Sequence, residues 1–237
     1  MNEVSQVKPP AECSVVIPVG PYVNNIAWLD DALDSLVKQT VQPKSVIFIY
    51  DGMDPIYRRS TDFYGIPFYH YRPPWRLGVG HAFNFGVALS KSECVFMMGS
   101  DDVLAPECLE YCLERYAQNE YRDAYYHVPV SYMSDGHVQY DPCNAAMVTK
   151  GLWRKTGGFP IEAPTAPDAA LISILMVHIP EALVSVGDGR PLYYYREHDE
   201  TDTRKHGRYH AEDVIVRTRN ILTEEWQPPV WSDRYGI

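Results

Sequence analysis

The sequence predicts an α/β fold in which a mostly parallel central sheet is flanked by helices. Short apolar runs that end at Pro, Gly or Asp alternate with segments of helical periodicity along the first part of the chain. Strands and helices that alternate in this way form parallel sheets, because each helix carries the chain back to the start of the next strand. With 237 residues, of which 46% are hydrophobic, the chain can bury a full core.

The first strand is expected at 14–17, an apolar run that Pro18 and Gly20 bring to an end. Asn24 or Asn25 is suited to cap the helix that follows, because a side-chain amide oxygen can accept a hydrogen bond from the first free N–H groups. The apolar residues of this helix recur at helical spacing: Ile26, Leu29, Leu33, Leu36 and Val37.

Three further strands continue the alternation. The run 46–50 is a second buried strand that stops at an Asp-Gly turn, and 66–69 is a shorter third strand. A helix opened by glycine is expected at 78–90, and the apolar run 94–98 is the fourth strand. Pro106 is placed at the start of the next helix, since proline is tolerated in a first helical turn.

The second half of the chain is less regular. Strand-like pieces at 124–132 and 138–140 precede a turn at 141–144. A helix around Leu152 runs into a Gly-Gly-Phe segment, and Asp168 begins an apolar helix that continues to Val177.

Acidic and glycine residues follow three of the predicted strands. Gly20, Asp51 and the pair Asp101–Asp102 each come just after a strand end. Because ligands of open parallel sheets bind outside the carboxyl ends of the strands, these residues are expected to converge on one crevice.

Composition and charge narrow the function classes. The formal net charge of −10 excludes a generally basic nucleic-acid binder. The five cysteines include no C-x-x-C pair, which fits free thiols in a reducing compartment, and Cys108 and Cys112 are expected to pack rather than to bind zinc. The N-terminus has neither a basic start nor an apolar run, and no stretch is apolar enough to span a bilayer. We therefore expect a cytoplasmic protein.

Six motifs occur in a fixed order from about Ser14 to about Thr201: SVVIPVG, YDGMD, LGVGHAFNFG, FMMGSDD, GGFPIEAPTAPDAAL and YREHDET. With them the chain resembles the inverting glycosyltransferases of family 2, which have the GT-A fold. The resemblance implies transfer of a sugar from a nucleotide-diphosphate sugar to an acceptor hydroxyl, with Mn²⁺ or Mg²⁺ as cofactor. It also implies a single domain over 1–237, with a nucleotide-sugar-binding half at about 12–102 and an acceptor-binding and catalytic half at about 103–237.

The resemblance assigns roles to residues of these motifs. Asp101 of FMMGSDD corresponds to a metal ligand, and carboxylate oxygens suit Mg²⁺ and Mn²⁺. His198 of YREHDET corresponds to a metal ligand or to a hydrogen-bond donor to the diphosphate. Asp168 corresponds to the catalytic base, which removes the acceptor proton as the hydroxyl attacks the sugar. The glutamate that precedes this base in the family is Pro167 here, and Glu162 is the next candidate for the base.

The nucleotide sugar is expected to bind along the same strand ends. Asp51 corresponds to the family aspartate that accepts a hydrogen bond from the nucleotide base. Asn84 and Gly86 match the family's Arg-Asn-x-Gly segment, whose arginine is Phe83 here, and Arg76 is the substitute for that charge. Thr201 and Arg196 are further donors to the diphosphate. The full set of predicted donor-binding residues is Pro18, Gly20, Asp51, Arg76, Gly78, Asn84, Ser100, Asp102 and Arg196.

Other interpretations remain open at this point. Asp51 also suits a turn, Asp102 and Asp168 suit helix N-termini, and His198 suits a solvated surface. A sugar-nucleotidyltransferase shares this type of sheet and metal, but its phosphate loop is usually basic, whereas GPYVNN here contains no Lys or Arg. A non-catalytic carbohydrate-binding module on the GT-A fold is favoured by three departures from the family motifs, at Gly99, Phe83 and Pro167. Gly99 replaces the first aspartate of the family's Asp-x-Asp-Asp motif, whose last two positions are Asp101 and Asp102. The acceptor is a glycan or another hydroxyl compound, and the net charge disfavours a nucleic acid.

Overall fold

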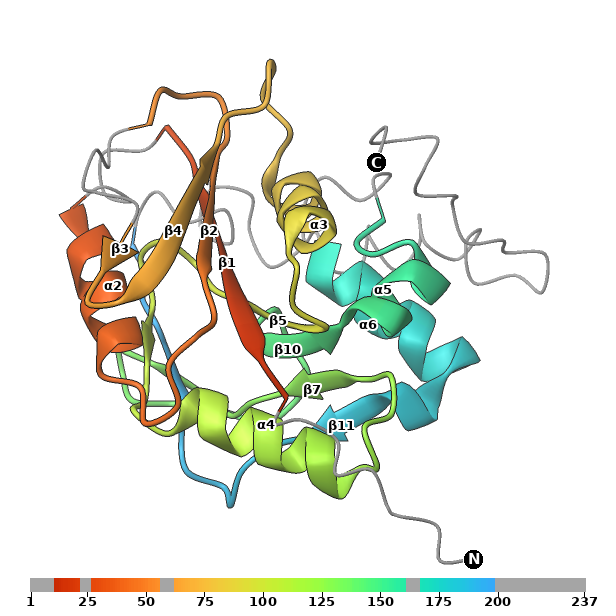
Figure 1. Ribbon diagram of the computed structural model, residues 1–237. Coiled ribbons are helices and arrows are strands. Elements are labelled where there is room, and N and C mark those ends of the chain that lie inside the picture. The colour runs from red at the N-terminus through yellow and green to blue at the C-terminus, as the bar shows by residue number, and fades with distance from the viewer. Residues whose placement is uncertain (1–10, 22–26, 56–61, 161–166, 199–237) are drawn as a thin grey trace, which may run out of the picture.

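The computed structural model describes residues 11–21, 27–55, 62–160 and 167–198, and its central element is an eight-stranded sheet (Figure 1). The strand order is β11-β7-β10-β5-β1-β2-β4-β3. In chain order the strands are β1 (Cys13–Val19), β2 (Val46–Tyr50), β3 (Asp62–Phe63), β4 (Ile66–Tyr71), β5 (Cys94–Met97), β7 (Tyr125–His127), β10 (Ala146–Thr149) and β11 (Leu183–Ser185).

The pairing of the strands confirms the predicted mixed, mostly parallel sheet. β1 pairs in parallel with both β2 and β5, β2 pairs in parallel with β4, and β7 pairs in parallel with β11. β10 is antiparallel to both of its neighbours, and β3 is antiparallel to β4. β10 was missed from the sequence because its four residues follow directly on a turn and lead directly into a helix.

A second, four-stranded sheet has the order β6-β12-β8-β9. Its strands are β6 (Val103–Leu104), β8 (Val130–Tyr132), β9 (Val138–Gln139) and β12 (Tyr193–Tyr195). The strand-like piece predicted at 124–132 is therefore divided between the two sheets. The division falls at Pro129, which has no N–H to donate to a ladder.

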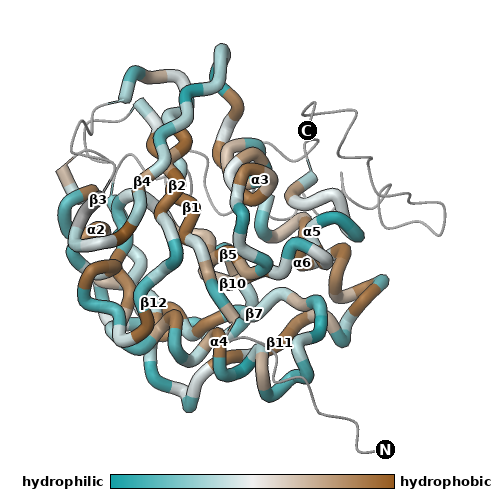
Figure 2. Tube along the Cα trace, viewed as in Figure 1, coloured by the Kyte–Doolittle hydropathy of each residue, from teal (hydrophilic) through white to brown (hydrophobic). Residues whose placement is uncertain are grey.

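Helices cover both faces of the large sheet (Figure 1). α2 (Leu29–Val37) and α4 (Cys108–Gln118) pack on one face, and α3 (Val79–Leu89), α5 (Lys150–Thr156) and α6 (Pro167–His178) pack on the other. A short 3-10 helix, η1 (Pro180–Ala182), precedes β11. Hydrophobic residues follow the central strands and α3, as Figure 2 shows.

Most helix boundaries agree with the expected ones. Gly78 is the N-cap of α3 and has a φ of 85°, a conformation that favours glycine. α4 begins at Cys108 rather than at Pro106, and the proposed caps Asn24 and Asn25 lie outside the described residues. Within the described part of the chain no helix is long and apolar enough to cross a membrane.

Gly86 sets the distance between α3 and the sheet. A Cβ on Gly86 would overlap Cγ1 of Val16 in β1, so only glycine lets the helix pack this closely. The glycine of the Asn-x-Gly pair thus has a packing role, and it fixes where the N-terminus of α3 lies relative to the strand ends.

Candidate donor-binding and catalytic site

The parallel pairing of β1, β2 and β5 brings their C-terminal ends to one edge of the sheet. Gly20, Asp51 and the segment 99–102 follow these ends, as the sequence predicted. β12 pairs with β6, directly after this segment, so that Arg196 and His198 come to the same edge.

Asp101 and His198 are in direct contact. Nε2 of His198 lies 2.7 Å from Oδ2 of Asp101, and the two side chains are 9% and 18% exposed, respectively. The two residues predicted as metal ligands are therefore adjacent, although 97 positions separate them in the chain.

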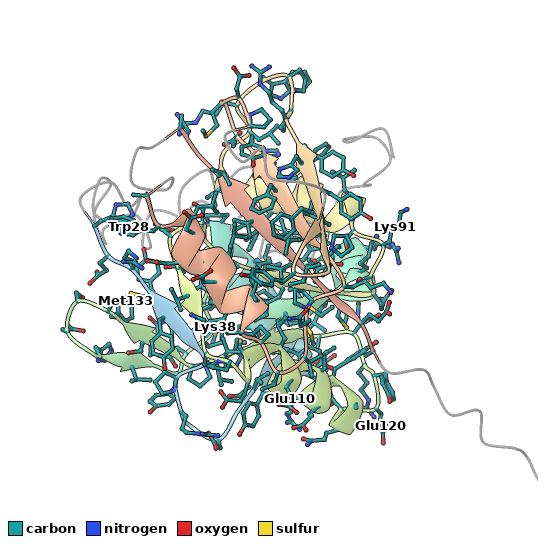
Figure 3. The ribbon with its side chains drawn as sticks, turned by 60° about the vertical axis from the view of Figure 1, so that its left-hand side comes forward. Trp28, Lys38, Lys91, Glu110, Glu120 and Met133 are labelled. Carbon is teal, nitrogen blue, oxygen red and sulfur yellow. The ribbon has the colours of Figure 1, made fainter. Side chains whose placement is uncertain are left out.

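Arg196 and Trp28 pack around the contact between Asp101 and His198. Arg196 donates from Nε to the carbonyl of Asp101 at 2.9 Å and pairs through Nη2 with Asp31 at 3.0 Å. Its guanidinium lies 4.8 Å from the Trp28 ring, and the His198 ring also lies 4.8 Å from that ring. Trp28 is labelled in Figure 3 beside α2, and its ring contacts both Arg196 and His198.

Asp102, the next residue of the turn, is 2% exposed. Its Oδ2 accepts the hydroxyl of Tyr193 at 2.5 Å, and its Oδ1 accepts the backbone N–H of Arg196 at 2.8 Å. Burial, reinforced by the neighbouring Asp101 carboxylate, raises the pKa of Asp102 to about 8, against the lowering effect of these donors. Direct contact between Asp102 and a nucleotide sugar stays a prediction, and the burial of Asp102 does not favour it.

The donor set at Asp101 suits a hard divalent cation. Among the described residues there is no group of three His, Cys, Asp or Glu side chains that could enclose a metal by itself. Mg²⁺ and Mn²⁺ do not need such a cage, because they bind through one or two carboxylates and complete their shell with water and substrate phosphates. One carboxylate and one imidazole at the sheet edge therefore fit a metal whose remaining ligands are water and substrate phosphates.

Asp51 is buried at the end of β2 and holds the start of α3. One carboxylate oxygen accepts the N–H of Leu77, and the other accepts the N–H of Gly78 at 2.9 Å. Each carboxylate oxygen has a second lone pair, so base recognition stays a prediction alongside this structural role. Arg76 is exposed, and its aliphatic carbons lie against Gly52 beside Asp51.

Asn84 binds the Gly-Gly-Phe segment. Its Nδ2 donates to the carbonyl of Phe159, and its Oδ1 accepts the N–H of Phe159, both at 2.9 Å. The side chain is 1% exposed, so a direct ligand contact stays a prediction that the geometry does not favour. Phe83, in place of the family arginine, is buried and packs against Phe159 at 5.8 Å between ring centroids.

Asp168 is half-buried at the start of α6, beside the first turn of α3. A Cβ on Gly80 of α3 would lie 2.8 Å from Cβ of Pro167. Burial raises the pKa of Asp168, while backbone N–H groups of Ala169 and Asn144 act to lower it. The predicted base is thus a half-buried carboxylate at the N-terminus of its helix.

Cys143 links Asp168 to the GSDD turn. Burial raises the pKa of the Cys143 thiol to about 12, and the negative charges of Asp168 and Asp102 both add to this rise. One thiol therefore lies within electrostatic range of both carboxylates. The strand pairing agrees with this: the Asn144 N–H hydrogen-bonds the Asp168 carboxylate just before β10, and Ala146 of β10 pairs with Met97 of β5, just before the GSDD turn. The predicted base and the metal motif are therefore at the same edge of the sheet.

The remaining predicted residues lie at or near the strand ends where the sequence places them, and their contact with a ligand stays a prediction. Pro18 lies in β1 beside Ile49, Gly20 follows β1, and Ser100 is buried in the turn after β5. Glu162 and Thr201 lie outside the described residues.

Two members of the site were not found from the sequence. Trp28 falls within the amphipathic helix that the sequence predicts, and Tyr193 falls within a run of three tyrosines. Neither pattern separates a core residue from a site residue. Their contacts with Asp102 and His198 appear only when β12 is placed beside the GSDD turn.

An α/β sheet whose strand ends gather carboxylates and an imidazole is typical of enzymes that bind nucleotides. Residues 14–168 match the model of the family described as Glycosyl transferase family 2, and the chain belongs to this family of nucleotide-sugar glycosyltransferases. A search of curated protein sequences gives no match.

Solved structures of S. aureus TarS resemble the chain. The TarS crystal structure has a TM-score of 0.65 at 16% identity, with 91% of this chain and 40% of the TarS chain covered. TarS 1–349 in complex with UDP-GlcNAc has a TM-score of 0.66 at 15% identity, with coverages of 91% and 68%. TarS 1–349 in complex with UDP has a TM-score of 0.64 at 18% identity, with coverages of 90% and 67%. The likeness shows a shared GT-A fold, and the chain spans well under half of the first of these proteins.

Proposed function

We propose that the chain transfers a sugar, in a metal-dependent reaction with inversion, from a nucleotide-diphosphate sugar to an acceptor hydroxyl. The observation that carries the proposal is the 2.7 Å contact between Asp101 and His198 at the sheet edge where Asp51 and Asp168 also lie. Membership of family 2 supports nucleotide-sugar transfer, and TarS has been solved with UDP and UDP-GlcNAc, so UDP-sugars are the first donors to test. The acceptor remains a glycan or another hydroxyl compound, and the cytoplasmic location stays a prediction.

Each residue of the site has a role in this reaction. Asp51 binds the nucleotide base, and Asp101 and His198 hold Mn²⁺ or Mg²⁺. When bound, the cation neutralises the negative charge that develops on the departing diphosphate. Arg196 orients the turn by its hydrogen bond to the Asp101 carbonyl.

Asp168 accepts the proton of the acceptor hydroxyl. Burial raises its pKa, and a carboxylate with higher proton affinity is a stronger general base as long as it stays ionised at the working pH. In a single displacement the attacking oxygen approaches the sugar opposite the diphosphate, so the product has inverted configuration.

The test of this proposal is nucleotide binding with and without metal. UDP and GDP are titrated calorimetrically in the presence of Mn²⁺ and then of a chelator, with the parent protein, Asp101→Ala and the exposed control Asp34→Ala. We expect metal to strengthen binding in the parent and in the control, and to have little effect in Asp101→Ala. Equal affinities with and without metal in the parent would contradict a metal-dependent site.

A non-catalytic carbohydrate-binding module is the second candidate. Gly99, Phe83 and Pro167 replace charged residues of the family motifs, and the structure gives Phe83 a place in the core. Donor hydrolysis separates the two functions, because an enzyme releases the nucleoside diphosphate slowly even without its acceptor. Release of UDP from a panel of UDP-sugars would favour the transferase.

A further inference from the structure

Gly99 stands where the family metal motif has its first aspartate. A Cβ placed on Gly99 would overlap Oδ2 of Asp102 and approach Oδ1 of Asp101 to 3.0 Å. The requirement for glycine is therefore one of space: a larger residue at this position would displace the Asp102 carboxylate.

A chain of hydrogen bonds passes through the space that Gly99 leaves open. The N–H of Gly99 donates to the Tyr193 hydroxyl at 3.0 Å, and that hydroxyl donates to Oδ2 of Asp102 at 2.5 Å. Oδ1 of Asp102 in turn accepts the N–H of Arg196 at 2.8 Å. Both ends of the segment from Tyr193 to Arg196 are thereby attached to the GSDD turn.

This attachment determines where His198 lies. His198 is two residues beyond the amide that Asp102 holds, and its ring meets Asp101 at the more exposed side of the turn. Asp101 and Asp102 thus have different partners. Asp101 contacts His198, whereas Asp102 is buried and accepts hydrogen bonds from the Tyr193 hydroxyl and the Arg196 N–H.

We propose that Gly99, Asp102 and Tyr193 form a positioning triad, which holds the 193–198 segment so that His198 and Asp101 present one metal site. In this proposal Asp102 is a positioning residue and not a metal ligand. The glycine departs from the family motif, and its missing side chain leaves the space that the Asp102 carboxylate occupies. The inference rests on the proposed function where it concerns the metal.

The first test needs no metal. Tyr193→Phe removes the hydroxyl that joins Gly99 to Asp102, and amide hydrogen exchange is measured in the metal-free protein. Tyr126→Phe is the matched control, because Tyr126 is equally buried, donates to the Arg122 carbonyl at 2.9 Å and accepts from Asn119 at 3.1 Å. We expect faster exchange at the amides of residues 99 and 196 in Tyr193→Phe only. Unchanged exchange at both amides would overturn the triad.

The second test measures metal affinity. Mn²⁺ binding in the presence of saturating UDP is followed by the loss of the free Mn²⁺ signal in electron paramagnetic resonance. Removing a group that orients a metal ligand typically weakens metal binding by about tenfold or more, and we expect this for Tyr193→Phe but not for Tyr126→Phe. Parental affinity in Tyr193→Phe would overturn the inference.

Gly99→Asp gives the sharpest contrast, with Gly99→Ala as a milder variant. If the first carboxylate of the motif were simply missing, Gly99→Asp would strengthen Mn²⁺ binding. The triad predicts weaker binding in both variants, because either Cβ displaces Asp102. Stronger binding in Gly99→Asp would overturn the inference, whereas a parent protein that binds no Mn²⁺ with UDP or GDP would overturn the proposed function even if the exchange result held.

Discussion

Replacement of Asp168 by Asn separates catalysis from folding at the proposed base. The amide has the shape of the carboxylate and keeps an oxygen that can accept a helix N–H, but it cannot take up the acceptor proton at neutral pH. The chain around the position should not move, because α6 is anchored by residues such as Leu171 and Leu175, which are fully buried.

The size of the rate effect follows from the role of a general base. Loss of such a group typically lowers the rate by about a hundredfold to ten-thousandfold, which corresponds to about 3 to 5 kcal/mol in the activation barrier. The nucleotide base and the diphosphate are bound by other residues of the site. We therefore expect the affinity for UDP with Mn²⁺ to change by less than about twofold, since Asp168 makes no ground-state contact with the donor in this mechanism.

The assay is transfer or donor hydrolysis under single-turnover conditions, with UDP affinity and melting temperature measured on the same samples. Asp141→Asn is the matched control, because Asp141 is an exposed aspartate three residues before Asn144, whose N–H lies near the Asp168 carboxylate. Transfer at the parental rate by Asp168→Asn, or a product of retained configuration, would refute the single-displacement mechanism with this base.

Three further substitutions test the supports of the site. Asp51→Ala should weaken UDP binding and reduce the preference between UDP and GDP, with a loss of about 1.5 to 3 kcal/mol in calorimetry, and it should also lower the melting temperature. Asn84→Ala removes two buried hydrogen bonds to Phe159 and should lower the free energy of unfolding by about 1 to 3 kcal/mol in denaturant titration; no change would show that water replaces them. Gly86→Ala should destabilise by about 1 to 3 kcal/mol through overlap with Val16, and the added change Val16→Ala should recover part of the loss.

The arrangement of strand ends was predictable because it depends on local patterns. Apolar runs that stop at Gly or Asp define parallel strands, and parallel strands place their C-terminal ends at one edge. The observed pairing of β1 with β2 and β5 confirms this for Asp51 and Asp101. No knowledge of the second half was needed, since each of these residues follows its own strand directly.

The contacts across the chain were not predictable from pattern. Tyr193 reaches Asp102 across 91 positions, and nothing in the periodicity of a three-residue strand indicates such a partner. The displacement that a side chain at position 99 would cause also depends on three-dimensional packing. From the sequence Gly99 reads as a lost aspartate, whereas in the structure it is the residue that makes room for Asp102.

The pH dependence of Asp168→Asn relative to the parent provides a last test, and its sign follows from burial. Burial raises the pKa of Asp168, so the folded protein binds more protons than the unfolded chain between the ordinary aspartate pKa of about 3.9 and the raised value. The free energy of unfolding of the parent therefore falls as the pH rises through this window. Asparagine does not titrate, so the melting temperature of Asp168→Asn should rise relative to that of the parent as the pH rises.

The transfer rate should respond in the same window and in the opposite sense. As the pH falls, protonation of Asp168 removes the general base, and the raised pKa places this loss at a higher pH than an ordinary aspartate would give. Melting temperatures of both proteins and the parental rate are measured from about pH 4 to pH 8, a range that starts at the ordinary aspartate value. A constant melting-temperature difference together with a rate that falls only near pH 4 would show that Asp168 titrates as an exposed carboxylate. In that case burial would not raise the pKa of Asp168, because the same pKa determines the pH dependence of both the stability and the transfer rate.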